Sequence, residues 1–572
     1  MSDAAEPAPG QKGELRRPAA FLAWPTAIPK PSATRTLQVA ALLAAFAVIA
    51  PVLGVALSIL EPTGSAWASL SSTVLPRYLL NTLALVAMVG VGVLAIGVPA
   101  AWLVTMYVFP GRRILEVALA LPLACPAYVV GYAYAYFLSH PGPMQSSLRA
   151  AFELGPRDYW FPQVQSVPGA AAMLTFVLYP YVYLLARAAF LQQSRRMLDV
   201  SRTLGAAPRA TFYRVALPMA RPAIVTGLAL ALMETLADYG TVSYFGVQTF
   251  STGVFKAWFS MGDRIAAAQL AGWLLMLVLL LLALERWSRS DRRFQSGRAQ
   301  FEALPQPRLT GWLGWAATGL CLIPAILGFA LPVAILFWMS LIDGHDLFTP
   351  RYLTLIWNSF TLSALAAAVA VGVAVLMAYA ARLAPGPLST GATLLASMGY
   401  ALPGSVIAVG VVIPMGGVTV ALNPWLRENL GFSLGLLLTS SIFALTYAYV
   451  VRYLAVALQT AEASLGKVTP SMDHAARSLG ENSVGALRRV HLPMIRGGLL
   501  TAALIVFVDV MKELPATLLM RPFNFDTLAV QTHNLASDDR LFQASTPALA
   551  IVAVGLLPVI FLSREIRRTR PS

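Results

Sequence analysis

Long apolar runs constrain this chain of 572 residues more than any other feature. Each run has about 20 residues or more, enough to cross a hydrocarbon core of about 30 Å as an α-helix. Backbone polar groups in lipid must be satisfied within the spanning segment, so we expect every run to be helical and the protein to be all-α and polytopic. The twelve expected spans are 36–60, 79–107, 114–137, 168–192, 220–246, 264–285, 311–342, 356–380, 388–415, 433–458, 496–520 and 545–563.

The distribution of charge indicates how the chain is oriented in the bilayer. Only 12% of residues are charged, against about 25% in soluble proteins. If the N-terminus is cytoplasmic, most of the Lys and Arg residues fall in cytoplasmic segments, including 187–221, 286–308 and 452–496. This is the positive-inside pattern. The net charge of +15 is therefore read as a topology signal in a multi-pass inner-membrane protein with both termini cytoplasmic, with the lipid bilayer and not nucleic acid as its partner.

A polar, basic motif occurs twice, 275 residues apart. Residues 202–226 align with 477–501 without a gap, and ten of the 25 positions are identical, where chance predicts roughly two. A weaker echo is the pair Asn81-Thr82 and Asn358-Ser359 at the start of two expected spans. The two halves of the chain are therefore copies of one another.

The longest polar stretch in the interior divides the chain into six expected helices plus six. An even number of helices in each half places both halves in the same orientation, so the repeat is parallel. We expect a disordered cytoplasmic tail at 1–35, a first transmembrane domain at 36–285, a cytoplasmic linker at 286–310 and a second transmembrane domain at 311–572.

Each copy of the motif is expected to form a helix–turn–helix on the inner membrane face. Gly205 and Gly480 permit a sharp turn, and Pro218 and Pro493 end one segment and allow the next helix to begin. The basic side chains of the motif could then reach acidic partners.

This motif resembles the "EAA" loop of ABC-importer membrane subunits. Both copies contain Gly, nine residues, Val, one residue and Leu-Pro, whereas the Glu of Glu-Ala-Ala is replaced by Asp199 in the first copy and His474 in the second. The segments 233–242, 509–518 and 521–529 further resemble fused ferric-ion permeases. The resemblance implies a type I ABC importer fold, with coupling loops at about 195–219 and 470–494.

The same resemblance implies partners and a role. A periplasmic binding protein would deliver the substrate, and two copies of an ATP-binding subunit would each hold one loop. The residues expected to contact them are Asp199, Arg202, Gly205, Leu217, Pro218, His474, Arg477, Gly480, Leu492 and Pro493. The chain contains no Gly-x4-Gly-Lys-Ser/Thr phosphate loop. We therefore expect no catalytic residues and no cofactor here, with ATP and Mg²⁺ bound by the partner subunits.

Ferric iron is the substrate favoured by the resemblance, with thiamine or a phosphonate as alternatives within the same class of importer. A secondary transporter driven by an ion gradient is the alternative of a different class, since a parallel repeat and intramembrane acids are compatible with it. The doubled loop favours the ABC importer, because a gradient-driven carrier has no ATPase to hold.

Four acidic residues lie inside expected spans, as two equivalent pairs. Glu234 and Asp238 are four residues apart on one helix face, and Asp509 and Glu513 repeat them 275 residues later. Buried charges in a bilayer are costly and usually face a pathway or a partner, and carboxylates suit hard cations. The four acids could line a cation pathway. Equally, they could cap helix breaks or pair locally, for example with Lys512. No metal ligands are assigned.

A stripe of tyrosines, Tyr128, Tyr132, Tyr134 and Tyr136, is expected near the outer end of the third span. Phenolates can bind ferric iron, but an interfacial aromatic belt is the favoured interpretation.

Overall fold

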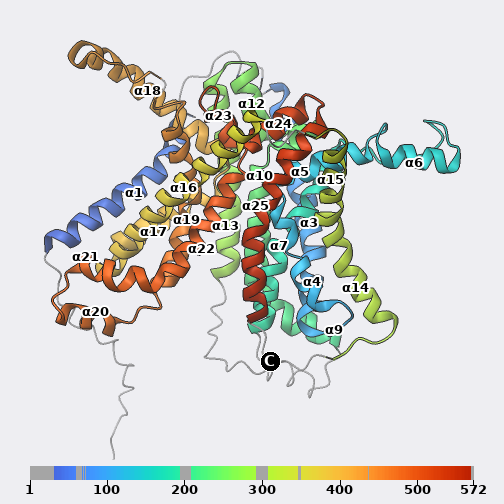
Figure 1. Cartoon of the computed structure of the whole chain (residues 1–572), viewed down its shortest axis with the longest axis horizontal. Helices are drawn as coiled ribbons and strands as arrows, with labels where there is room; N and C mark the ends of the chain where they lie inside the picture. The colour runs from blue at the N-terminus through green and yellow to red at the C-terminus, as the bar shows by residue number, and fades with distance from the viewer. Residues whose placement is uncertain are drawn as a thin grey trace, which may run out of the picture.

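The computed structural model describes residues 31–58, 67, 70, 72–192, 208–290, 307–344, 349–435 and 437–568. Within these ranges the chain is helical, and an isolated β-bridge between Val108 and Arg308 is the one extended pairing found there. Eleven helices are long and apolar enough to span a membrane, or twelve when the bent pair Arg112–Ala124 and Ala127–Phe152 counts as one span. The chain is a multi-pass membrane protein (Figure 1).

The helices of the first half run in the order of the chain. They are α1 (Pro31–Ser58), α3 (Leu75–Met106), α4 (Arg112–Ala118), η1 (Leu121–Ala124), α5 (Ala127–Leu138), α6 (Pro143–Phe152), α7 (Val167–Gln192), α9 (Pro208–Thr211), η2 (Phe212–Ala216), α10 (Leu217–Ala237), α11 (Gly240–Tyr244), α12 (Phe250–Phe255), η3 (Lys256–Ser260) and α13 (Arg264–Ser290).

The second half repeats this order. Its helices are α14 (Trp312–Ala325), η4 (Ile326–Ala330), α15 (Leu331–Asp343), α16 (Pro350–Leu383), α17 (Pro387–Ser397), η5 (Gly399–Ala401), α18 (Gly404–Leu430), α19 (Ile442–Leu465), α20 (Pro470–Ser478), α21 (Ser483–Ala486), η6 (Leu487–His491), α22 (Leu492–Met511), α23 (Pro515–Met520), α24 (Leu528–Ser537) and α25 (Leu541–Arg568).

Every expected span has a helical counterpart, with shifts at some boundaries. Helix α1 begins at Pro31, inside the segment expected to be a disordered tail, and α13 continues to Ser290, into the expected linker. The remainder of the tail, 1–30, and residues 291–306 of the linker lie outside the described residues. The end of the linker, 307–309, is hydrogen-bonded to Val108 after α3.

The two halves are interlocked, because the first helix of each half packs on the other half. Helix α1 lies against α16, α17 and α18, whereas α14 and α15 lie against α3, α4 and α5 of the first half. Figure 1 shows α1 on the left beside the second-half helices and α14 and α15 on the right. Each large apolar core therefore mixes residues from both halves: Ala41 and Ala45 share one with Leu454, and Leu336 shares the other with Leu174.

The repeated asparagines, Asn81 and Asn358, make equivalent contacts in the two halves. Asn81 donates from its amide Nδ2 to the carbonyl oxygen of Gln248 at 2.9 Å, and Asn358 donates to that of Asp526 at 3.1 Å. The hydroxyl of the next residue accepts a backbone N–H in each case, Thr82 from Phe250 and Ser359 from Leu528. Each contact ties the second span of a half to the segment that follows its fifth, which shows that the copies fold alike.

Candidate functional site

Two spans in each half are broken where the sequence predicted continuous helices. The expected span 114–137 breaks at Pro126 and the span 388–415 breaks at Pro403, and both prolines are extended, with ψ of 142° and 141°. Proline lacks an N–H and forces the preceding residue out of the helical region, which accounts for both breaks. The spans 220–246 and 496–520 break after Ala237 and Met511.

Asp238 and Glu513 cap the short helices that follow the second pair of breaks. The carboxylate of Asp238 accepts hydrogen bonds from the Thr241 hydroxyl at 2.9 Å and the Val242 N–H at 3.0 Å. That of Glu513 accepts from the Ala516 N–H at 2.9 Å and from both the N–H and the hydroxyl of Thr517, at 3.1 and 2.7 Å. A broken helix exposes N–H groups that need acceptors in a membrane. Asp238 and Glu513 therefore accept hydrogen bonds from backbone N–H groups at the helix breaks, which is the capping role predicted as the alternative to a cation pathway.

Glu234 and Asp509 have a different environment, since both are paired with cations and remain partly exposed. Glu234 Oε2 lies 3.8 Å from Arg452 Nη2, and its side chain is 29% exposed. Asp509 Oδ1 lies 2.8 Å from Lys512 Nζ, three residues along the chain. The predicted local pairing of Asp509 with Lys512 is confirmed by this contact.

All four acids line one cavity of about 120 Å³, where the broken helices of the two halves meet. This volume holds several water molecules. The same cavity is lined by two cationic residues, Arg452 and Lys512, and by five tyrosines, Tyr128, Tyr181, Tyr239, Tyr400 and Tyr453. Four carboxylates against two cations give the cavity a formal charge of −2, which favours a cation over an anion as its occupant.

Three of the four tyrosines in the stripe are buried and do not form an aromatic belt facing lipid, contrary to the favoured interpretation, whereas Tyr136 is partly exposed. Tyr128, Tyr132 and Tyr134 are each at most 5% exposed. Tyr132 bonds through its hydroxyl to His533 Nδ1 at 2.7 Å, and Tyr134 donates to the carbonyl of Leu327 at 2.6 Å. These side chains instead pack the interior, because α5 is covered by α7, α11 and α15.

The segment expected to be the second coupling loop comprises α20, the turn at Gly480, α21 and η6. Gly480 has a φ of 84°, in the left-handed region that only glycine adopts readily. His474 and Arg477 lie on the exposed surface of α20, Leu492 is partly buried and Pro493 is exposed. The side chain of Leu479 is 84% exposed, so this loop presents both apolar and basic groups outward.

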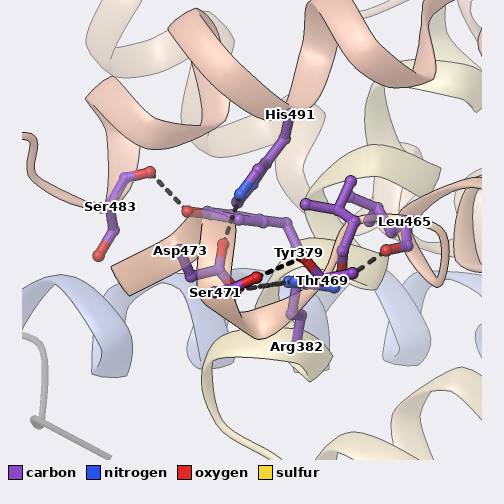
Figure 2. Close-up of polar contacts among 9 residues, drawn as sticks. Tyr379, Arg382, Leu465, Thr469, Ser471, Asp473, Ser483 and His491 are labelled. Carbon is purple, nitrogen blue, oxygen red and sulfur yellow. Dashed lines mark hydrogen bonds and ion pairs between the residues drawn. The ribbon is translucent and has the colours of Figure 1, made fainter. Parts of the chain in front are cut away.

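A polar cluster fixes α20 against the end of α16 (Figure 2). Asp473 bridges two partners, Arg382 Nη2 at 2.8 Å and His491 Nε2 at 2.6 Å. Arg382 also donates to the carbonyl oxygens of Leu465 and Val468, at 2.9 and 2.8 Å. The ion pair between Asp473 and Arg382 thus holds the loop against α16, the second span of the second half, and the pair with His491 joins α20 to η6 within the loop.

The first loop is described from Pro208 onward, so Asp199, Arg202 and Gly205 lie outside the described residues. Leu217 and Pro218 begin α10, as Leu492 and Pro493 begin α22, and a five-residue π-turn precedes each pair. A proline ring clashes with the carbonyl four residues earlier, and a widened turn relieves that clash. The shared Leu-Pro therefore gives both loops the same entry into the membrane.

Comparison with known proteins places these features in a family. Residues 93–288 match the family of binding-protein-dependent transport system inner membrane components. The chain is also 28% identical, over 496 residues, to the Fe(3+)-transport system permease protein FbpB 2 of Haemophilus influenzae, covering 85% of this chain and 89% of the relative. The chain is therefore a homologue of ABC permeases, with the length of a fused, two-repeat protein.

Two further relatives show the range of the family. The probable ABC transporter permease protein y4fN of Sinorhizobium fredii is 21% identical, with 85% of this permease and 87% of the relative covered. The molybdenum transport system permease protein ModB of Escherichia coli is 27% identical over 211 residues, which is 36% of this permease and 89% of ModB. ModB thus matches a length close to that of one half of this chain.

Two residues central to these sites were missed in the sequence. Arg452 was counted with the cytoplasmic segment 452–496, but it lies within α19 with its side chain 9% exposed. Its position inside the expected span 433–458 was the available signal, because an isolated arginine in an apolar run is costly. Asp473 gave no comparable signal, since its partners come from α16 and η6, which are distant in sequence.

Proposed function

We propose that this permease forms the membrane pathway of an ATP-driven importer for ferric iron. The observation that carries the proposal is the cavity between the halves, where four carboxylates outnumber two cationic side chains. Ferric iron is a hard cation, and carboxylate and phenolate oxygens are suited to such ions. The similarity to the Fe(3+)-transport system permease protein of Haemophilus influenzae supports the same cargo.

The alternatives fit the cavity less well. A phosphonate is an anion and would meet a formal charge of −2, and the same argument applies to the anion named for the related sulfate permeases. Thiamine carries a single positive charge, so its electrostatic attraction to the four carboxylates would be weaker than that of a trivalent ion. A secondary transporter would leave the doubled coupling loop without a use.

In this proposal the two coupling loops face the cytoplasm and each binds one ATP-binding subunit, while a periplasmic binding protein docks on the opposite face. The positions of the loops support this arrangement: in Figure 1, α9 and α20 both lie in the lower part of the view. Helix α10 runs 21 residues from its loop to the cavity, roughly 30 Å of helix rise. Movement of a loop would therefore reach the cavity through one continuous helix.

The test is cargo-stimulated ATP hydrolysis by the full complex in lipid vesicles. Binding protein loaded with ferric iron should stimulate hydrolysis and iron uptake, and binding protein offered thiamine or a phosphonate should not. The double variant Glu234→Gln, Asp509→Asn should lose most of the uptake, because it removes both acids that are not committed to helix capping. Glu428→Gln, which changes an exposed acid near the end of α18, outside the cavity and both coupling loops, is the matched control. Unchanged uptake in the double variant would refute the pathway assigned to these acids.

A further inference from the structure

We propose that Arg452 is a tethered counter-cation of the central cavity. In the empty permease its guanidinium neutralises Glu234 of the first half, and the entering cargo cation displaces it. This inference rests on the cationic cargo proposed above, and it adds a means by which occupancy of the cavity changes a contact between the halves.

Arg452 bridges the halves at the cavity. It lies in the middle of α19, in the second half, and its Nη1 is 3.3 Å from Glu513 Oε1 of the same half. Its Nη2 is 3.8 Å from Glu234 Oε2, which belongs to α10 of the first half. One side chain thus links α10 to the second half through a charge that faces the space where a cation would sit.

The bridge is loose by the standards of arginine–carboxylate pairs. Both contacts are longer than the roughly 2.7–2.9 Å of strong charge-assisted hydrogen bonds, and Arg452 Nε is buried without a partner. Arg187 provides the contrast within the same protein, since its Nε at 3.1 Å and its Nη2 both donate to Glu116. Arg187 is built to stay in place, whereas Arg452 is only partly satisfied.

Of its two partners, Glu234 is the one that a cation can take over. Glu513 is 1% exposed and already accepts three hydrogen bonds from Ala516 and Thr517. Glu234 is 29% exposed, and its carboxylate makes the long contact to Arg452. A cation entering the cavity therefore reaches Glu234 first and competes there with the guanidinium.

The released guanidinium has a place to remain. The Arg452 Cζ lies 5.5 Å from the centre of the Tyr453 ring, within the range of a cation–π contact, and Glu513 stays beside it. Lys512 cannot substitute as the bridge, because it is paired at 2.8 Å with Asp509 of its own segment. Displacement of Arg452 would thus remove an ion pair between α10 and α19 without leaving a buried charge unpaired.

The experiment measures cation binding directly, using Tb³⁺ as a trivalent probe that undergoes no redox change. Tyrosines transfer excitation energy to Tb³⁺ at short range, and five of them line the cavity. Titrations use the complete complex in detergent, with wild type, Arg452→Gln, Arg452→Lys, Glu234→Gln and the double variant of Arg452→Gln with Glu234→Gln. Glu428→Gln, which changes an exposed acid near the end of α18, controls for surface binding.

Arg452→Gln should bind Tb³⁺ about tenfold more tightly, because a competing unit charge a few ångströms away is removed. Arg452→Lys should stay near wild type, and Glu234→Gln should abolish the gain. If Arg452 were merely structural, Arg452→Gln would bind Tb³⁺ equally or more weakly in a complex of normal elution volume, and this result would overturn the inference. The absence of sensitised emission in both wild type and Arg452→Gln would overturn it as well. The identity of the cargo is tested by a separate measurement. If iron-loaded binding protein does not stimulate ATP hydrolysis by the wild-type complex, ferric iron is not the cargo.

Discussion

Replacement of Gly480 tests whether the turn in the second coupling loop transmits the work of ATP hydrolysis. The last turn of α20 closes with the Glu481 N–H on the Ala476 carbonyl and the Gly480 N–H on that of Arg477, both at 3.0 Å. This is the Schellman arrangement, which requires a left-handed residue at Gly480, where φ is 84°. A Cβ at this position would meet no atom within 4 Å, so Gly480→Ala incurs conformational strain without a clash.

The strain has a predictable size. A β-carbon in the left-handed region costs roughly 1–2 kcal/mol, which reduces the population of this turn by a factor of about 5–30 relative to competing loop conformations. We expect Gly480→Ala to lower the substrate transported per ATP hydrolysed, by at most this factor, with little change in expression. Gly480→Asn should lose less, because Asn tolerates the left-handed region better.

The assay compares transport and hydrolysis in the same vesicles containing the full complex. Gly497→Ala is the matched control, since Gly497 lies in α22, is exposed and also has no atom within 4 Å of the added carbon. Alanine favours a helix over glycine by about 1 kcal/mol, so coupling should be retained there. Equal coupling in Gly480→Ala and Gly497→Ala, or a greater loss in Gly480→Asn than in Gly480→Ala, would refute the conformational argument.

Three further predictions concern contacts that hold the helices in place. Glu116→Gln should destabilise the permease by about 3–5 kcal/mol, because it leaves the buried Arg187 without its carboxylate, and the midpoint of thermal unfolding in detergent should fall accordingly. Asn81→Ala and Asn358→Ala should each lower the free energy of unfolding by about 1 kcal/mol, because each removes one hydrogen bond at equivalent positions. Clearly unequal shifts of the thermal midpoint would contradict the equivalence of the halves. Asp473→Asn should increase hydrogen exchange in α20 selectively, because it weakens both ion pairs that hold this helix, and unchanged exchange there would show that the pairs contribute nothing.

The spans were predictable from sequence because lipid imposes a local rule. A run of about 20 apolar residues has to be largely helical regardless of its neighbours, and each expected span contains a helix, although four of them are broken. The convergence of Glu234, Asp238, Asp509 and Glu513 on one cavity was also foreseeable, because the 275-residue offset places them at equivalent positions of two copies.

The features that could not be predicted from the sequence share a physical cause, because they depend on contacts between distant segments. Hydropathy is averaged over a window of residues, so Arg452 did not stand out within an apolar run, although it forms an ion pair between the halves with Glu234. The exchange of α1 and α14 between the halves leaves no trace in hydropathy, because an apolar helix satisfies lipid wherever it packs. The breaks at Pro126 and Pro403 were visible as residues, but proline alone does not break every membrane helix: Pro99 and Pro180 lie within α3 and α7.

The duplicated acids also show how the two copies diverge. Asp238 and Glu513 keep one task, capping the helix after the break, and a backbone with orphaned N–H groups leaves little freedom there. Glu234 and Asp509 face the cavity, where no such demand exists, and their partners differ: one is neutralised across the halves by Arg452 and the other by Lys512 in its own segment. A cation arriving in the cavity therefore meets two unequal carboxylates, and only its contact with Glu234 alters an ion pair between the halves. For that reason Glu234→Gln should weaken the stimulation of ATP hydrolysis by cargo more than Asp509→Asn, although both remove one negative charge from the same cavity.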